Sequence, residues 1–589
     1  MNDHPLEFIL GTELGLQTDS YSQIMKWIFK PKDSDKIKKI QDDLNLPYHV
    51  VNILLNRDIK NIQHIKSFLS DKLLNLHDPF LMKGMDIAVN RIIKNIRSGK
   101  PIAIVGDYDL DGISAVSLLK IGLEKLGGKV FTYIPHRRIE GHGIPKEFLI
   151  KSIKKGVNLY ITCDFGISEL GTIKETNRYG LDCIITDHHT PGEILPPAFS
   201  ILNPNQEGCS YPFKELSGSG VAFKLVAGIN IKLNDSYESI EEIIDIAAIG
   251  TAADQVPLIG ENRLLVKYGF ERIRAKSRPG LKLLSKLIKY DNLDKMNLSN
   301  FNYKIAPFLN AAGRIEDANI VIDFLTTENS TYIETITKRL IWINKKRQSI
   351  QSNSIQEAIE MVSSDDISKK LIILKKDSWH PGIIGIIATN VRNKFNLPSI
   401  IITFDEKGNG NGSVRSFKGV NIYKLLSQFT KYFETFGGHS YAVGFTLKKE
   451  KYAKFKDSIY KYLSKTKLII FEENFVLDGK LQLDEINYEF IKSIKYLSPF
   501  GPSNPRPRFL IKKLNIIGNP IIIGKGSILR FKVKKNNKVM DVVAFGKSNE
   551  YKNLILGELI DIAGCPEINL WRGRKTIQFN AQAIRLSNN

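Results

Sequence analysis

Three short apolar runs, each followed directly by acidic residues, constrain the fold of this 589-residue chain more than any other feature. The runs and the acids after them are Pro101–Val105 before Gly106–Gly112, Val157–Cys163 before Asp164, and Leu181–Thr186 before Asp187-His188-His189. Amphipathic stretches at Ile113–Leu126 and Glu169–Tyr179 can form helices between these strands. Parallel βαβ connections bring the carboxyl ends of strands to one edge, where open α/β sheets bind ligands. The sequence therefore predicts an α/β fold with a parallel sheet.

The segment from Gly106 to Gly112 carries three acids, Asp107, Asp109 and Asp111. They cannot all be buried without a counter-ion, because mutual repulsion and desolvation would neutralise them. A cluster of hard oxygen ligands favours a divalent cation. Taken by itself, this motif is equally consistent with a solvated Asp-rich turn that caps the following helix.

Acids and imidazoles at the ends of later elements favour the metal site. Asp164 follows the second strand, and His188 and His189 follow the third. Asp254 comes after a helix-like run that we expect to break at Gly250. Each acid alone could be a turn residue or a helix cap, but their repetition at successive element ends indicates a shared site. Carboxylates with imidazoles suit Mn²⁺ or Mg²⁺ better than a structural zinc, which is usually bound by cysteines.

The composition is that of an ordinary soluble globular protein, with 42% hydrophobic and 25% charged residues. A chain of this length should divide into roughly three or four domains. No apolar run approaches the ~18 residues that a membrane helix needs. The four cysteines show no paired ligand spacing, so we expect a cytoplasmic protein with reduced thiols and no membrane partner.

The net charge of +22 suggests a polyanionic partner such as nucleic acid. Lys far outnumbers Arg, and Ile and Asn are also plentiful. A compositional drift toward these residues could raise the charge without selection for binding, so the charge supports nucleic acid only in part.

Changes of pattern along the chain predict five segments. They are a helical segment at 1–70, an α/β domain at 71–295, a linker with one long helix at 296–365, a smaller α/β domain at 366–450, and a β-rich segment at 465–589. The long helix should span Ser330–Val362, which lacks Gly and Pro. We expect turns at Arg278–Gly280 and Asn310–Arg314, and a small β-barrel in the last segment.

Three glycine-rich stretches of the smaller α/β domain could bind phosphate. They are Trp379–Gly385, which should begin a helix, Gly408–Ser416, which carries hydroxyls and an Arg, and Gly437–His439, with tight turns beside an imidazole. Backbone N–H groups at a helix start and an Arg fork both suit phosphate oxygens. A single loop of this kind is more often a hairpin, and the case rests on finding three together.

In this order, the motifs resemble those of the DHH phosphoesterase superfamily. Asp-Tyr-Asp-x-Asp-Gly, Asp-x-Gly-Ile, Thr-Asp-His-His and Gly-Thr-x-Ala-Asp-x-Val-Pro-Leu resemble the signature of its DHH domain. Trp-His-Pro-Gly-Ile-Ile-Gly, Gly-Ser-x-Arg-Ser and Gly-Gly-His resemble the DHH-associated domain, DHHA1. The resemblance covers the chain from about residue 20. With the Asn-Ala-Ala-Gly-Arg motif and a tail containing Pro-Phe-Gly-Pro-Ser-Asn-Pro, the chain is similar to the superfamily's single-strand-specific exonucleases, which implies an OB-like barrel at its end.

The resemblance also implies roles for individual residues. The ligands of a two-metal site would be Asp109, Asp111, Asp164, His188, His189 and Asp254. Asp107 and Asp187 would support them by orienting ligands or holding lysine or water. A pocket for a 5′-phosphate would be formed by Arg137, Arg278, Arg314, Ser413, Arg415 and His439.

The activity implied by the resemblance is 5′→3′ hydrolysis of single-stranded DNA with two Mn²⁺ or Mg²⁺ ions, in DNA repair and recombination. The partners would be single-stranded DNA, with a single-strand-binding protein and a helicase as further candidates. Two alternatives are a phosphodiesterase for short oligonucleotides or cyclic dinucleotides and a non-catalytic DNA-binding scaffold. The first would not need the barrel or the basic first segment, and the second should have lost ligand acids, which are all present.

Overall fold

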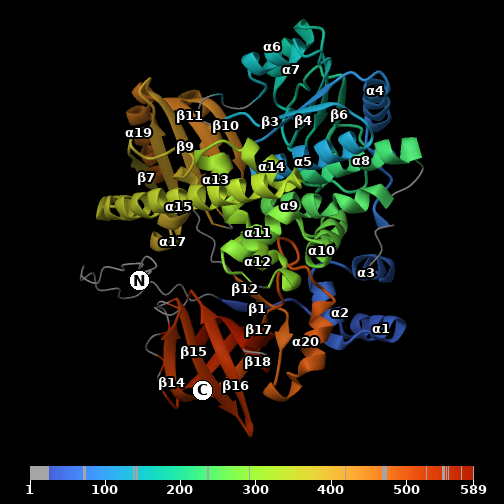
Figure 1. The fold of residues 1–589 in the computed structure, drawn as a ribbon. Coiled ribbons are helices and arrows are strands. Elements are labelled where there is room, and N and C mark those ends of the chain that lie inside the picture. Colours follow the sequence, from blue (N-terminus) through green and yellow to red (C-terminus); the bar gives the residue numbers. More distant parts are fainter. Residues whose placement is uncertain are drawn as a thin grey trace. The chain divides into compact units, whose positions relative to one another are not determined.

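The computed structural model divides into two compact units, Lys72–Phe471 and the combination of Met1–Asp71 with Glu472–Asn589 (Figure 1). The residues it describes are 26–70, 75–136, 140, 143–234, 238–290, 292–417, 420–466, 474–524, 527–546, 551, 554, 556–571 and 574–587. Among these residues, no helix combines the length and the apolar character needed to cross a membrane.

The larger unit begins with a five-stranded sheet in the order β3-β2-β4-β5-β6, and every neighbouring pair in it is parallel. The strands are β2 (Ile102–Gly106), β3 (Val130–Tyr133), β4 (Leu159–Cys163), β5 (Asp182–Thr186) and β6 (Ser200–Leu202). Every residue of β2 and β4 is buried, as is typical of a parallel sheet covered on both faces. The predicted parallel α/β fold is confirmed.

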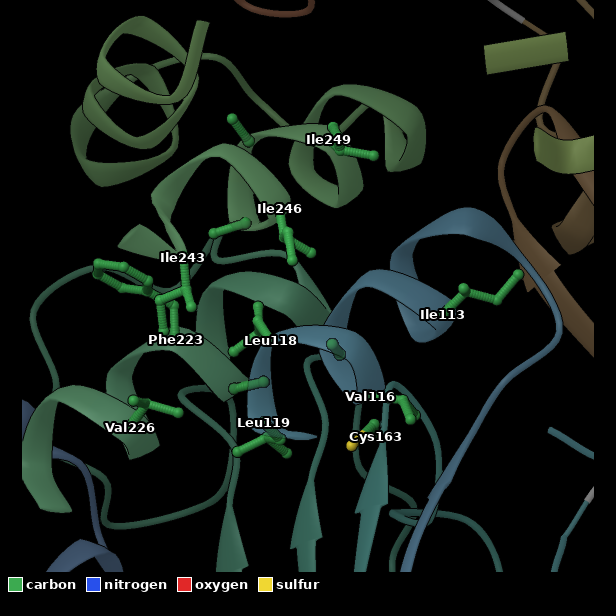
Figure 2. Close-up of a cluster of buried hydrophobic side chains, with 14 of the residues drawn as sticks. Ile113, Val116, Leu118, Leu119, Cys163, Phe223, Val226, Ile243, Ile246 and Ile249 are labelled. Atoms are coloured by element: carbon green, nitrogen blue, oxygen red, sulfur yellow. The ribbon is translucent and has the colours of Figure 1, made fainter. Parts of the chain in front are cut away.

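Helices cover both faces of this sheet (Figure 1). They are α4 (Met85–Arg97), α5 (Leu110–Lys125) and α8 (Gly218–Asn234) on one face, and α6 (Lys146–Ile153) and α7 (Leu170–Arg178) on the other. Alternate residues of β2 point to opposite faces, so Ile104 joins one core cluster and Val105 the other. Figure 2 shows the first cluster, where Leu118 and Leu119 of α5 belong to the same core as Phe223 of α8.

A layer of further helices follows the sheet and ends in one long helix. Its members are α9 (Ile244–Asp254), α10 (Gly260–Ala275), α11 (Pro279–Leu287), α12 (Leu298–Lys304), α13 (Ala306–Ile315), α14 (Asn319–Thr326) and α15 (Ser330–Glu360). The helix α15 has 31 residues and matches the predicted long helix to within two residues at its end.

The predicted break at Gly250 and the predicted turn at Asn310–Arg314 are wrong, because both lie inside helices. A Cβ on Gly250 would stand 2.4 Å from Oγ of Ser219 and 2.5 Å from Oδ1 of Asp111. A Cβ on Gly313 would stand 2.0 Å from the carbonyl oxygen of Tyr108. These glycines therefore allow helices to approach their neighbours closely, and they do not end the helices.

The second sheet of the larger unit has the order β10-β11-β9-β8-β7, with only β7 and β8 parallel. Its elements are α16 (Ser364–Ser368), β7 (Ile372–Lys375), α17 (Ile384–Phe395), β8 (Ser399–Phe404), β9 (Asn409–Arg415), α18 (Ile422–Leu426), β10 (Phe433–His439), β11 (Ala442–Lys448) and α19 (Lys449–Lys465). Two of the predicted glycine-rich loops are therefore mainly strands, β9 and β10, because both pair with β11. The third stretch precedes α17, which begins only at Ile384.

The smaller unit contains a closed five-stranded barrel. Its strands are β14 (Phe509–Ile523), β15 (Ile528–Lys535), β16 (Lys538–Phe545), β17 (Leu559–Trp571) and β18 (Arg574–Leu586), and β14 pairs with both β15 and β17 to close it. The predicted OB-like barrel is confirmed, although its strands are longer than the sequence suggested. The short strands β12 (Phe475–Leu477) and β13 (Gly479–Lys480) and the helix α20 (Tyr488–Lys495) precede it.

Elements from the two ends of the chain share the core of the smaller unit. The strand β1 (Trp27–Phe29) pairs with β12, and α1 (Ser34–Leu44), α2 (Tyr48–Asn56) and α3 (Ile62–Leu69) contribute to one apolar cluster with the barrel. The segment predicted at 1–70 therefore includes helices that fold with residues more than 400 positions away, such as Asn52 with the carbonyl of Asp478. The boundaries predicted for the other segments stay predictions.

We expect Ile53→Ala to destabilise the barrel as well as the helix that carries it, because Ile53 is fully buried in the shared cluster. The loss should be about 2–5 kcal/mol, the usual range for truncating a buried Ile. Hydrogen exchange of the barrel strands in the full chain measures this effect, with Lys38→Ala on the exposed side of α1 as the control. Unchanged protection of β14 and β17 would contradict a shared core.

Candidate metal centre

The carboxyl edge of the parallel sheet gathers the acids and histidines that the sequence singled out. Asp107 follows β2 directly, Asp164 follows β4, and Asp187, His188 and His189 follow β5. Asp254 is the last residue of α9, which packs on α5. Parallel strands thus bring residues that are distant in sequence to one place, as predicted.

The start of α5 holds two of these acids by backbone hydrogen bonds. Oδ1 of Asp109 accepts from the N–H groups of Asp111 and Gly112 at 2.9 and 3.1 Å, so Asp109 caps the helix. The carboxylate of Asp111 accepts from the N–H groups of Gly218 at 2.7 Å and Ser219 at 3.0 Å. Burial, followed by the charge of Asp109, raises the pKa of Asp111 to about 6. The first turn of α8 therefore fixes a carboxylate that water does not reach.

His188 lies between two buried carboxylates. Its Nε2 stands 3.1 Å from Oδ1 of Asp164 and 3.7 Å from Oδ2 of Asp254. Burial lowers the pKa of His188 to about 4, so the ring is neutral and Nε2 can offer a lone pair. The pKa values of Asp164 and Asp254 are raised well above the ordinary value of an aspartate. Burial is the largest cause, and the charge of Asp111 is the next.

Asp187 has a different environment and supports its neighbours. Its carboxylate accepts hydrogen bonds from the N–H groups of Ile167, His188 and His189, at 2.9, 2.7 and 3.1 Å, and lies 2.7 Å from Nδ1 of His189. Burial alone would raise the pKa of Asp187, but the bond to His189 and the backbone donors lower it. Nδ1 of His189 therefore points at Asp187, which leaves its Nε2 available for a cation.

Three sets of side chains place possible ligand atoms within 4.8 Å of one another. The sets are Asp164 with His188 and His189, Asp111 with His188 and Asp254, and Asp107 with Asp109 and Asp164. The third set includes Asp107, which sequence reasoning placed among the supporting residues. Its position directly after β2, next to the ligand-bearing turn, is the signal that could have added it to the candidate ligands.

These residues fit hard divalent cations. Oδ1 of Asp164 and Oδ2 of Asp254 are buried, and no donor among the described residues hydrogen-bonds to either atom. Such oxygens are expensive to bury without a partner, and a cation would satisfy both. Several carboxylates with two imidazoles form the donor set that Mn²⁺ and Mg²⁺ accept.

The residues predicted to bind a terminal phosphate differ in where the structure places them. Arg137 lies outside the described residues. The guanidinium of Arg278 pairs with buried Asp245, with Nε 2.8 Å from Oδ2 and Nη2 2.9 Å from Oδ1, and also bonds to the carbonyl of Leu325. Internal partners therefore occupy Arg278, and the structure does not support its predicted role in substrate binding. The sequence did not predict Asp245 as its partner, because Asp245 lies on α9 and Arg278 precedes α11, 33 positions later.

Arg314 lies on a helix of the larger unit, and Ser413, Arg415 and His439 lie on two strands of its second sheet. Arg314 is on α13, and its Nη1 donates to the carbonyl of Gly382 at 3.3 Å. Arg415 ends β9, and its Nη1 donates to Oγ of Ser413 at 3.1 Å. Besides burial and His189, the charge of His439 is among the causes that lower the pKa of His188, so His439 lies within electrostatic reach of the metal cluster.

Comparison with known protein families matches three parts of the chain. The N-terminal domain of the DHH family matches residues 101–251, the DHHA1 domain matches residues 368–465, and the RecJ OB domain matches residues 477–583.

Several characterised proteins are similar over most of their length. The single-stranded-DNA-specific exonuclease RecJ of Bacillus subtilis is 37% identical over 561 residues, covering 94% of this chain and 70% of the relative. The protein of the same name from Escherichia coli is 31% identical over 453 residues, covering 73% of this chain and 78% of the relative. The crystal structure of RecJ with Mn²⁺ from Thermus thermophilus has a TM-score of 0.80 at 26% identity, covering 96% of this chain and 80% of that one.

We expect the metal-free protein to lose stability as the pH rises from about 4, the ordinary pKa of an aspartate, through about 6, the raised pKa of Asp111, and beyond. The folded-state pKa values of Asp111, Asp164 and Asp254 are raised, so their contribution is present at low pH and is lost as the pH passes through those values. Mn²⁺ binds the deprotonated carboxylates, so it should raise the melting temperature more at the higher pH. Asp164→Asn should weaken both effects, and a Mn²⁺ shift that is independent of pH would contradict this assignment.

Asp187→Asn should lower the affinity for Mn²⁺ by about 10–100-fold, because a neutral amide orients the ring of His189 less strongly than the carboxylate does. Isothermal titration of the metal-free protein with Mn²⁺ measures the change. Asp86→Asn on the exposed side of α4 is a matched control and should bind as the unmodified protein does. Equal affinities for all three proteins would show that Asp187 does not support a ligand.

Proposed function

Because this chain belongs to the RecJ family, we propose that it is a metal-dependent exonuclease that degrades single-stranded DNA from its 5′ end in DNA repair and recombination. The observation that carries this proposal is the set of carboxylates and imidazoles gathered at the carboxyl edge of the parallel sheet, with two buried oxygens that lack a donor among the described residues. Each turnover adds one water across a P–O bond and releases a nucleotide.

The cluster would hold two Mn²⁺ or Mg²⁺ ions. The proposed ligands are Asp109, Asp111, Asp164, His188, His189 and Asp254, to which the geometry adds Asp107. Bound cations of this kind lower the pKa of a water molecule and offset the charge that develops on the scissile phosphate. The protein's own contribution is to keep the ligands in place, through the start of α8 for Asp111 and through Asp187 for His189.

The substrate's 5′-phosphate would bind at Arg314, Ser413 and Arg415, with Arg137 and His439 as further candidates. Arg415 and Ser413 are joined by a hydrogen bond, which orients the guanidinium fork for phosphate oxygens. Holding the end of the strand while the cluster acts on the adjacent linkage would make hydrolysis proceed one nucleotide at a time.

The barrel would bind the single strand. OB folds bind single strands through basic grooves that tolerate different sequences, and the net charge of +22 agrees with such a role. We also propose a cytoplasmic location, where the chromosome of a bacterial relative lies, and a single-strand-binding protein and a helicase as partners that expose or deliver the strand.

Two rival functions are less well supported. A phosphodiesterase for short oligonucleotides or cyclic dinucleotides would not need the barrel, yet residues 477–583 match the RecJ OB domain. A non-catalytic scaffold would not need to bury several acids at a cost in stability, yet burial raises the pKa of Asp111, Asp164 and Asp254 here.

Asp164→Ala should lower nuclease activity by at least about 1,000-fold while single-stranded DNA still binds, because the variant removes a proposed ligand shared by two of the clusters. Digestion of end-labelled single strands with Mn²⁺ measures the rate and shows which end shortens first. Glu175→Gln, at a surface ion pair on α7, is the control and should be fully active. A fully active Asp164→Ala variant would contradict the assignment of Asp164 as a metal ligand. Digestion of duplex and single-stranded DNA at equal rates would indicate a general nuclease.

A further inference from the structure

Two asparagines that follow β6 contact the main chain of both histidines in the metal cluster. Nδ2 of Asn205 donates to the carbonyl of His188 at 2.8 Å, and Nδ2 of Asn203 donates to the carbonyl of His189 at 2.9 Å. The N–H groups of the same histidines donate to Oδ1 of Asp187. Side chains therefore satisfy all four main-chain polar groups of His188 and His189, a task that backbone partners perform in regular secondary structure.

A proline ends the ladder between β5 and β6 just before these contacts. Thr186 lies opposite Leu202, and the N–H of Asp187 donates to the carbonyl of Leu202 at 3.0 Å. In this parallel register the carbonyl of Asp187 would next accept from the N–H of residue 204, but Pro204 has no N–H to donate. The histidine carbonyls lie beyond that point, so the two asparagine amides extend the connection between the strands where the backbone cannot.

The turn that carries both amides is itself held in place. Asn203 is fully buried, and its Oδ1 accepts from the N–H of Asn205 at 2.8 Å, which forms an Asx turn around Pro204. Nζ of Lys214 donates to the carbonyl of Pro204 at 2.7 Å, and the N–H of buried Gln206 donates to the carbonyl of Asn203 at 3.2 Å. Although the side chain of Asn205 is exposed, its main chain is fixed on both sides. The turn therefore presents both amides in one arrangement.

We propose that Asn203 and Asn205 are positioning residues that fix the imidazoles of His188 and His189 at the metal cluster through their main chain. His188 belongs to two of the three candidate ligand sets and His189 to one. Ligand atoms must be held to within about 0.5 Å for a metal site to keep its affinity, and a main chain free to shift does not meet that requirement. This inference rests on the proposed two-metal function and adds two residues that support ligands without being ligands themselves.

Calorimetric titration of the metal-free, full-length protein with Mn²⁺ tests this role. Asn205→Ala should raise the Kd for Mn²⁺ by about tenfold, the lower end of the effect of removing a residue that supports a metal ligand. Asn205→Gln keeps a donor amide and should lose less affinity. Asn177→Ala is the matched control, because it removes another bond from an exposed amide to a carbonyl, that of Pro197, outside the metal cluster. This control should bind Mn²⁺ as the wild type does.

Asn203→Ala should raise the Kd for Mn²⁺ at least as much as Asn205→Ala does. It removes the bond to the carbonyl of His189 and also releases the N–H of Asn205 from its acceptor. Because Asn203 is fully buried, this variant should also melt at a lower temperature. The titration is therefore run well below the melting temperature of each protein.

Thermal unfolding separates positioning from general stabilisation. Asn205→Ala changes an exposed side chain and should leave the melting temperature of the metal-free protein nearly unchanged, while the upward shift produced by a fixed concentration of Mn²⁺ becomes smaller. A lower melting temperature with an unchanged Kd would show a structural role alone and would overturn the inference. An equal loss of affinity in Asn205→Gln and Asn205→Ala would overturn it too, because the amide contact would not be the cause.

The wild type separates a failure of this inference from a failure of the proposed function. If the wild type binds Mn²⁺ and digests single strands, and both alanine variants bind Mn²⁺ equally well, the inference alone is overturned. If the wild type binds no Mn²⁺, the proposed function is overturned and the inference with it.

Discussion

Repulsion between carboxylates buried at one edge of the parallel sheet is the constraint on which the larger unit depends. Burial raises the pKa of Asp111, Asp164 and Asp254, and the charges of neighbouring carboxylates, Asp109 among them, add to the effect. The fold nevertheless keeps them close, with the first turn of α8 bonded to Asp111 and with a glycine in α9 where a Cβ would collide with that carboxylate. An arrangement that is unfavourable by itself and rigidly supported is what a cation site requires, because the ion supplies the missing charge.

Two arginines of the larger unit differ in whether a carboxylate balances their charge. Arg278 meets buried Asp245 and two backbone carbonyls, so its charge is balanced inside the protein and its role is structural. Among the described residues, Arg347 donates hydrogen bonds to two amide oxygens, and the charge of Arg314 acts on it. Removing one partner of a buried ion pair is strongly destabilising, whereas a buried charge without a counter-charge marks a candidate binding site. Among the described residues, the acidic edge keeps two buried carboxylate oxygens without a hydrogen-bond donor, and divalent cations would satisfy them.

Much of the fold and of the metal centre could be predicted from local sequence. The apolar runs before Asp107, Asp164 and Asp187 predicted parallel strands, because an uninterrupted apolar run ended by a polar turn is typical of a strand buried on both faces. The 31-residue helix α15 followed from a stretch without Gly or Pro. Errors arose where glycine was interpreted as a break. Gly250 and Gly313 are inside helices, since what they provide is room for a neighbouring chain segment, and such a neighbour cannot be seen in a local window.

The sequence by itself determined the order of secondary-structure elements and the chemical types gathered at the sheet edge, because strand and helix patterns and motif spacing are local properties. Only the tertiary structure decided which charges are paired. It showed that Arg278 is bound to Asp245, that Arg347 has no acidic partner among the described residues, and that α1–α3 share a core with the barrel from the other end of the chain. These outcomes depend on contacts between residues far apart in sequence, where the balance of burial and charge is set by neighbours that the local pattern does not reveal.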